Sequence, residues 1–125
     1  MATLNSFEDL ECWKSARILT RLIYKIFAES RDFGFRDQIQ RASVSIMNNI
    51  AEGFGRIGVK EKLQFTNIAV GSAQEVKSML FLAQDLWYIT ESESQSLDTE
   101  LRKTLETTQG FRRYLNTAEV RNYKR

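Results

Sequence analysis

A row of polar residues borders the apolar side of the segment from Gln38 to Arg56, and their types could do chemistry. Arranged as a helix, the segment brings six of them to one edge of its apolar stripe: Gln38, Arg41, Ser45, Asn49, Glu52 and Arg56. Carboxylate, amide, hydroxyl and guanidinium groups can serve as acids, bases or anion ligands. The same groups can satisfy one another as a hydrogen-bonded seam between packed helices.

The absence of histidine limits the catalytic interpretation. A chain without histidine has no His-based triad, no imidazole-ligated zinc and no His-carboxylate relay. Glu52 and Glu75 remain as a carboxylate pair for acid-base or metal chemistry, but the Glu-x-x-His pairs of di-iron bundles cannot form. We therefore expect no catalytic residues, no metal site and no cofactor.

A structural seam is the favoured interpretation of the polar row. The segment after it, about 60–89, is expected to be a helix with Ser72 inside its apolar stripe and Gly71 and Glu75 beside it. A buried polar group left unpaired costs about 1–3 kcal/mol, so these side chains are expected to pair between helices. The predicted seam consists of Arg41, Ser45, Asn49, Glu52, Ser72 and Glu75.

Residues Gly53 to Gly58 read GFGRIG, which formally matches the dinucleotide-binding pattern G-x-G-x-x-G. That pattern works after a buried strand and before a helix, whereas here it follows a helical segment in a chain without period-two alternation. A turn between two helices is therefore favoured. The amides that open the next helix, with Arg56, Lys60 and Lys62 nearby, could hold an isolated phosphate.

Helical periodicity runs through almost the whole chain, in segments of about 7–30, 37–54, 60–89 and 93–119. The chain has no proline to kink a helix, and RDFGFRD, GFGRIG and TESES mark the breaks, with Asp37 as a possible helix start. The third segment is expected to turn the following residues inward: Phe65, Ile68, Ala69, Ser72, Val76, Met79, Leu80, Ala83, Leu86 and Trp87. Because connections this short place consecutive helices antiparallel, the sequence predicts an all-α, antiparallel up-down-up-down four-helix bundle.

Length and composition place this bundle in one domain over residues 1–125, with 42% hydrophobic and 27% charged residues, as in ordinary globular chains. No apolar run approaches the ~20 residues that span a bilayer, and the N-terminus lacks the pattern of a secretion signal. Cys12 is the only cysteine, so no intramolecular disulfide can form. We expect a cytoplasmic protein with no membrane partner.

Charge supplies the main functional signal, because the cations are clustered although the net charge is only +2. Lys14, Arg17, Arg21 and Lys25 form a stripe on the outer side of the first helix, with no acidic residue between Glu11 and Glu29. A second group lies near the C-terminus: Arg112, Arg113, Arg121, Lys124 and Arg125. Such basic surfaces suit phosphate backbones, and the alternative is a solvated helix face and a frayed tail.

The third helical segment carries a second set of apolar residues. Leu63, Val70 and Phe81 point away from the inward set. A row of this kind along one helix predicts a contact between subunits. We therefore expect a homo-oligomer.

Three stretches resemble the four-helix-bundle family of 23S rRNA intervening-sequence proteins: FEDLECWKSARILTRLIY, FGFRDQIQRASVSIMNNIAEGFGR and FTNIAVGSAQEVKSMLFLAQDLWYI. The resemblance implies a four-helix bundle that assembles into a ring-like pentamer, with no established enzymatic activity. It also implies a relation to the accessory variability protein of diversity-generating retroelements, which binds a reverse transcriptase and nucleic acid.

Together these observations predict a non-enzymatic, oligomeric bundle whose basic surfaces bind RNA, DNA or a nucleic-acid-handling protein such as a reverse transcriptase. The alternative is a scaffold or adaptor that binds only protein and whose charges serve solubility.

Overall fold

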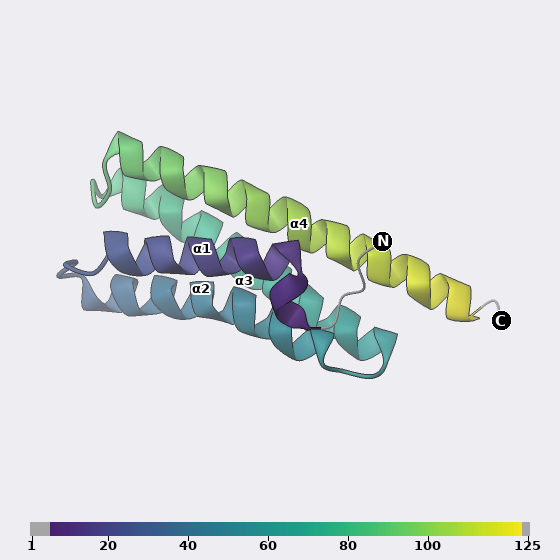
Figure 1. Ribbon diagram of the computed structural model, residues 1–125. Coiled ribbons are helices and arrows are strands. Elements are labelled where there is room, and N and C mark those ends of the chain that lie inside the picture. Colours follow the sequence, from purple (N-terminus) through teal and green to yellow (C-terminus); the bar gives the residue numbers. More distant parts are fainter. Residues whose placement is uncertain (1–5, 124–125) are drawn as a thin grey trace.

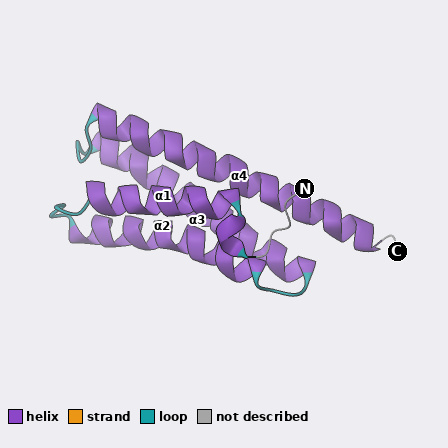
Figure 2. Ribbon diagram, viewed as in Figure 1, coloured by secondary structure: helices purple, strands orange, loops and turns teal. Residues whose placement is uncertain are grey.

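The computed structural model describes the backbone of residues 6–123 and the side chains of residues 6–117. A short 3₁₀ helix, η1 (Phe7–Asp9), precedes four α-helices: α1 (Glu11–Ile26), α2 (Phe33–Phe54), α3 (Val59–Asp85) and α4 (Glu91–Tyr123). The described part of the chain contains helices, turns and loops and no strand (Figure 2). None of its helices is both long enough and apolar enough to cross a membrane.

The four α-helices form a bundle in which each packs against two neighbours. α1 contacts α2 and α4, and α3 contacts α2 and α4, so that α1 and α3 lie diagonally opposite. Consecutive helices run antiparallel, and the α1–α2 and α3–α4 loops lie at the same end of the molecule (Figure 1). The structure confirms the predicted all-α, up-down-up-down bundle.

All four helices contribute to one core along the bundle axis. Its largest fully buried apolar side chains are Leu19, Ile23, Phe27, Ile39, Ile46, Ile50, Val76 and Leu97. In α1 and α2 they recur at intervals of four or seven positions, which keeps them on one face of each helix, as the sequence periodicity predicted. Burying each stabilises the fold by roughly 1.5–3 kcal/mol relative to an exposed side chain.

The interior face of α3 is narrower than predicted. Ala69, Ala73, Val76, Leu80 and Ala83 form it, spaced alternately four and three residues apart. Ile68 precedes Ala69 by one position, about 100° around the helix, and is 51% exposed. Ile68 therefore belongs to the outer surface and not, as predicted, to the core.

Leu86 and Trp87 were also predicted to face inward, but α3 ends before them. The Trp87 amide donates to the Gln84 carbonyl and the Tyr88 amide to the Ala83 carbonyl, at 3.1 and 2.9 Å. These two bonds and the φ of 60° at Trp87 form a Schellman motif, in which glycine commonly takes the left-handed position. Because the backbone reverses here, Leu86 is 44% and Trp87 90% exposed.

Two helix starts differ from the expected positions because side-chain caps set them. Asp32 Oδ1 accepts the Phe35 amide at 3.1 Å, so α2 begins at Phe33 and not near Asp37. In TESES, the Thr90 hydroxyl accepts the Glu93 amide and the Glu93 carboxylate accepts the Thr90 amide, at 3.0 and 2.9 Å. This reciprocal capping box starts α4 at Glu91.

At the remaining ends, the first predicted helix, 7–30, is divided into η1 and α1, and α1 stops at Ile26. The third predicted helix, 60–89, ends early at Asp85 because of the Schellman motif. The fourth, 93–119, extends at both ends to Glu91–Tyr123.

Candidate nucleic-acid interface

The basic stripe of α1, Lys14, Arg17, Arg21 and Lys25, lies on the outer surface of the bundle. All four residues are exposed, whereas Cys12, Ala16, Leu19 and Ile23 bury the opposite side of the same helix. Because the stripe residues recur every three or four positions, they share one face over about three helical turns. The sequence thus places four cations in a row where a ligand can reach them.

Neighbouring side chains leave most of this stripe uncompensated. Lys14 Nζ lies 3.5 Å from Glu11 Oε1 in an exposed ion pair. The Arg17 guanidinium lies over the Trp13 ring, 5.5 Å from its centroid, a contact that leaves its N–H donors free to point outward. Within residues 6–117, Arg17, Arg21 and Lys25 form no ion pair.

A groove between α1 and α4 runs beside the stripe, and the sequence analysis did not identify it. Its volume is about 600 Å³, and it is lined by Ile18, Arg21, Leu22, Lys25, Ser96, Thr99 and Glu100. Arg21 and Lys25 therefore belong to both the stripe and the groove. Oε2 of Glu100 is buried and has no hydrogen-bond partner.

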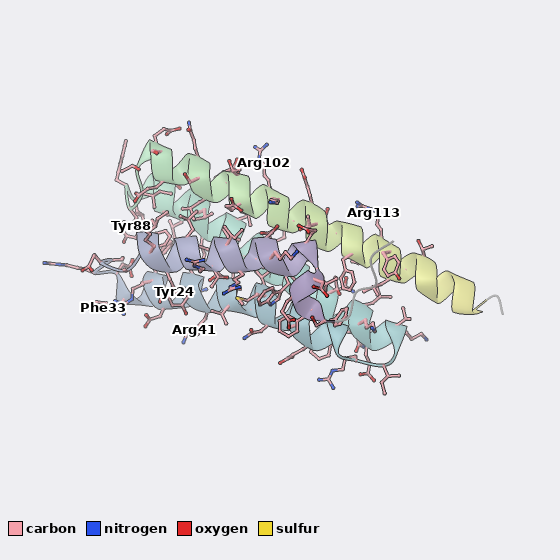
Figure 3. The ribbon with its side chains drawn as sticks, viewed as in Figure 1. Tyr24, Phe33, Arg41, Tyr88, Arg102 and Arg113 are labelled. Atoms are coloured by element: carbon pink, nitrogen blue, oxygen red, sulfur yellow. The ribbon has the colours of Figure 1, made fainter. Side chains whose placement is uncertain are left out.

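The C-terminal basic residues do not join the α1 stripe. Arg112 is half-buried, and its Nη1 donates to Oδ1 of Asn67 on α3 at 3.3 Å, which directs it to the α3 side of α4. Arg113 is exposed and extends from the C-terminal half of α4 (Figure 3). The side chain of Arg121 and the whole of Lys124 and Arg125 lie outside the described residues.

Part of the predicted polar seam is present between α2 and α3. The hydroxyl oxygens of Ser45 and Ser72 lie 2.8 Å apart across the helix contact. Asn49 joins them from within α2, donating to the Ser45 carbonyl at 2.8 Å and to its hydroxyl at 3.0 Å. Glu75 makes a separate exposed contact, accepting from Gln38 Nε2 at 3.2 Å.

The structure does not bring Arg41 and Glu52 into this seam. Both are exposed and form no hydrogen bond or ion pair within the described residues, and Arg41 points away from the bundle (Figure 3).

A polar contact that sequence analysis missed joins α1 and α2. The hydroxyl of buried Thr20 on α1 donates to the Ser43 carbonyl of α2 at 3.1 Å. Nothing in the sequence around Thr20 pointed to this contact.

The opening row of polar residues, which lies within the described part of the chain, does not gather into a metal-binding cluster. Among the described residues, no three His, Cys, Asp or Glu side chains are grouped so as to hold a metal ion. Burial raises the pKa of the Cys12 thiol to about 11, so the thiol stays protonated near neutral pH and is a poor nucleophile. Of the predicted seam, Ser45 and Ser72 form a hydrogen bond between helices, and Asn49 supports it from within α2.

The GFGRIG segment forms the predicted turn between two helices. At Gly53 an added Cβ would lie 2.8 Å from Cβ of Phe65, so glycine permits α2 and α3 to approach closely there. Lys62 Nζ donates to the Phe54 carbonyl at 3.3 Å near the end of α2, and Arg56 lies over the Phe65 ring. Lys62 and Arg56 thus make contacts within the turn. Because the turn follows a helix and not a strand, it is not the phosphate-binding loop of a dinucleotide site.

The exposed apolar surface of α3 is larger than the predicted set. Leu63 and Val70 are half-buried, and Phe81 is 58% exposed. The other large exposed apolar residues on α3 and directly after it are Ile68, Leu82, Leu86, Trp87 and Tyr88. Several apolar side chains on α3 and directly after it are therefore exposed where a partner could cover them.

The fold and the surface define a small helical bundle with a cationic outer face. The sequence model of the 23S rRNA-intervening sequence protein family matches residues 8–110, and the chain belongs to this family. No match was found among curated proteins.

A solved structure shares the fold. It is a protein with unknown function from the S23 ribosomal protein family of Bacteroides thetaiotaomicron VPI-5482, 22% identical, with a TM-score of 0.71. The match covers 82% of this chain and 94% of that chain. Neither the family name nor the name of this structure denotes an enzyme.

Proposed function

We propose that this protein is a non-enzymatic homo-oligomer that binds nucleic acid through the basic stripe of α1. The observation that carries the proposal is the exposed row Lys14, Arg17, Arg21 and Lys25, three of which have no ion-pair partner within the described residues. Release of counterions from the phosphate backbone would supply the affinity.

The stripe has the dimensions of a backbone-binding surface. From Lys14 to Lys25 the helix rises about 16 Å. One strand of a duplex carries a phosphate every ~3.4 Å along the axis, so this length spans about five phosphates of one strand, enough for each of the four cations to face one. Contacts of this kind position a nucleic acid without reading its sequence.

Assembly would repeat this modest stripe on every subunit. The exposed apolar residues of α3 support a subunit interface there, since burying Phe81 and its neighbours removes apolar area from water. We propose that Leu63, Val70 and Phe81 lie at or beside this interface. A pentamer is the form that the resemblance implies.

The second candidate is a scaffold that binds only protein. Trp87, at 90% exposure, and Leu86 beside it would suit a protein partner, because tryptophan is enriched among the residues that dominate interface energies. A nucleic-acid-handling partner such as a reverse transcriptase would combine both candidates.

A salt series on two charge-matched variants tests the proposal. One replaces Lys14, Arg17, Arg21 and Lys25 by Gln, and the control replaces Arg31, Arg41, Arg102 and Lys103, four exposed cations outside α1. Affinity for a mixed-sequence oligonucleotide is measured by fluorescence anisotropy. In the stripe variant the slope of log affinity against log salt is expected to become shallower by up to roughly 0.7–0.9 per lost contact. The control is expected to show a smaller change in this slope.

Equal flattening in both variants would show that total charge, and not the stripe, drives binding. An absence of binding by the unmodified protein at low salt would overturn the proposal in favour of the protein-only scaffold.

A further inference from the structure

We propose that the basic stripe of α1 binds single-stranded nucleic acid, whose bases stack on Trp13 and Tyr24 along the side of the stripe that faces α2. This inference rests on the proposed function and narrows it to one form of nucleic acid. It starts from two observations, a line of aromatic side chains beside the cations and a lack of carboxylates on the same side of the stripe.

Trp13 and Tyr24 lie on one line along α1. They are eleven positions apart, which at about 100° per residue is three turns and about 20° more. Arg17 lies close to the same line, four positions after Trp13. The helix rises about 16 Å from Trp13 to Tyr24. The line therefore has an aromatic residue at each end and a cation between them.

This aromatic line borders the stripe on the side of α2. Thr20, seven positions after Trp13 and so about 20° from it around the helix, is buried and donates to the Ser43 carbonyl of α2. Arg21 precedes Tyr24 by three positions, which makes the two side chains neighbours on the helix surface. The aromatic line thus lies between the cations and α2.

Both aromatic side chains are accessible, but to different degrees. Tyr24 is 44% exposed, and no hydrogen bond or ring contact within the described residues holds it. Trp13 is half-buried and packs edge-on against Phe7, with 5.0 Å between centroids, while the Arg17 guanidinium lies over its ring. A guanidinium plane can itself stack on a base, so Arg17 extends the aromatic line and does not block it.

The distribution of carboxylates favours the α2 side of the stripe for a polyanion. Residues 12–28, which include most of α1, and residues 38–51 of α2 contain no aspartate or glutamate. On the opposite side of α1, Glu100 of α4 lines the groove. Because like charges repel, a strand held by the cations is expected to extend towards α2 and not towards α4.

Cations beside aromatic rings favour a single strand over a duplex. In a duplex the faces of the bases cover one another inside the helix, where a side chain cannot reach them. Proteins that bind single strands combine a cationic track for the backbone with aromatic side chains on which bases stack. Here the stripe would hold the phosphates while the bases turn towards Trp13 and Tyr24. Every base has a face to stack, so no sequence preference is expected.

Anisotropy titrations with three labelled probes over a salt series test the inference. The probes are a thymidine dodecamer, an abasic strand with the same number of phosphates, and a duplex of the same length. Extrapolation to high salt removes the contribution of counterion release. The thymidine strand is then expected to bind about tenfold more tightly than either other probe, as is typical when an aromatic residue stacks on a base.

Variants of Tyr24 assign this difference to α1. Tyr24→Ala should weaken binding of the thymidine strand about tenfold. Binding of the abasic strand and both salt slopes should stay unchanged, because no charge is removed. Tyr24→Phe keeps the ring and should bind like the unmodified protein. Tyr114→Ala is the control, an exposed tyrosine on α4 that should have no effect on the preference for the thymidine strand.

Trp13→Leu tests the other end of the line and should also weaken binding of the thymidine strand alone. Circular dichroism and urea unfolding show whether this half-buried position tolerates the change. If Trp13→Leu does not fold, the exposed Tyr24 still decides the question.

Other outcomes separate this inference from the function on which it rests. Equal binding of the thymidine and abasic strands, or tighter binding of the duplex after extrapolation, overturns base stacking and leaves the basic stripe intact. An equal loss in Tyr24→Ala and Tyr114→Ala, or a loss in Tyr24→Phe as large as in Tyr24→Ala, overturns the role of the α1 rings. No binding of any probe at low salt overturns both the inference and the proposed function.

Discussion

Tyr88 and Asp32 connect the two loops at one end of the bundle. The Tyr88 hydroxyl donates to Asp32 Oδ2 at 2.7 Å, while Oδ1 of the same carboxylate accepts the Phe35 amide that starts α2. The Tyr88 ring also packs edge-on against Phe35, with 5.4 Å between centroids. One carboxylate thus connects the α1–α2 loop, the first turn of α2 and the α3–α4 loop.

This contact makes stability depend on pH at both extremes. The hydrogen bonds from Tyr88 and the Phe35 amide lower the pKa of Asp32, and the bond to Asp32 raises the pKa of Tyr88. A lowered carboxyl pKa stabilises the fold above the unfolded value of ~3.9, and this contribution is lost as pH falls through the folded pKa. The raised tyrosine pKa stabilises the fold below ~10, and this contribution is lost as pH rises through the folded pKa.

Tyr88→Phe should therefore lower the urea midpoint most between these limits. Its difference from the unmodified protein should shrink as pH falls below ~3.9 and as pH rises above ~10. Urea titrations across pH measure this directly. A midpoint difference that is constant from acid to alkali would show that the hydroxyl contributes without coupling to either ionisation.

Gly53→Ala should destabilise the protein by about 1–3 kcal/mol, because overpacking a close helix contact forces backbone to move. The new Cβ would lie 2.8 Å from Cβ of Phe65, which is fixed near its backbone and cannot swing away. Gly110→Ala is the matched control within α4, since its Cβ would meet only the tip of Arg113, at 3.8 Å. There the better helix propensity of alanine should stabilise by up to about 1 kcal/mol. Denaturant unfolding of both variants would contradict the close-contact interpretation if the two shifts had the same sign.

Ser72→Ala should cost about 0.5–1.5 kcal/mol, because it removes the hydroxyl that pairs with Ser45 between α2 and α3. Ser45→Ala should have a similar effect, and the double variant should cost less than the sum of the two. Exposed Ser78→Ala on the same helix should change stability by no more than about 0.5 kcal/mol. Additive costs in a thermodynamic cycle would mean that the two hydroxyls do not support each other.

Phe81→Glu should reduce the oligomeric mass while leaving the helical content unchanged, because Phe81 is 58% exposed and carries little of the core. Tyr114→Glu on α4 is the control, with an aromatic residue of nearly the same exposure, 59%, outside the α3 surface. Light scattering and circular dichroism measure the two effects. A mass unchanged by Phe81→Glu, or lowered equally by Tyr114→Glu, would move the subunit contact away from α3.

The fold was predictable because periodicity reports which side of each helix is buried. This held for α1 and α2, where Leu19, Ile23, Ile46 and Ile50 follow the expected spacing. It failed at Ile68, because the small residues Ala69, Ala73 and Ala83 form a narrow buried strip on α3. It failed at Trp87 because α3 ends at Asp85, before that residue. The sequence pattern does not distinguish an apolar residue just outside that strip from one within it.

The candidate site was less predictable than the fold. The cations of α1 were evident because they share one helix, and their spacing alone places them on one face. The α1–α4 groove was missed because Glu100 lies 75 residues or more from Arg21 and Lys25, and only packing brings them together. The two helix starts, in contrast, have local sequence signals. Asp32 and Thr90 are residue types that cap helix N-termini, and each lies directly before the first residue of its helix.

The positions of the two tryptophans give the protein two separate optical reporters. Trp13 lies under the Arg17 guanidinium beside the basic stripe, and Trp87 lies exposed after the apolar surface of α3. In a Trp87→Phe variant, the emission of Trp13 should change when an oligonucleotide occupies the stripe. In a Trp13→Phe variant, the emission of Trp87 should shift to shorter wavelength when the subunits associate. This shift should reverse on dilution. One fluorimeter can thus follow ligand binding and subunit association independently, without an attached dye.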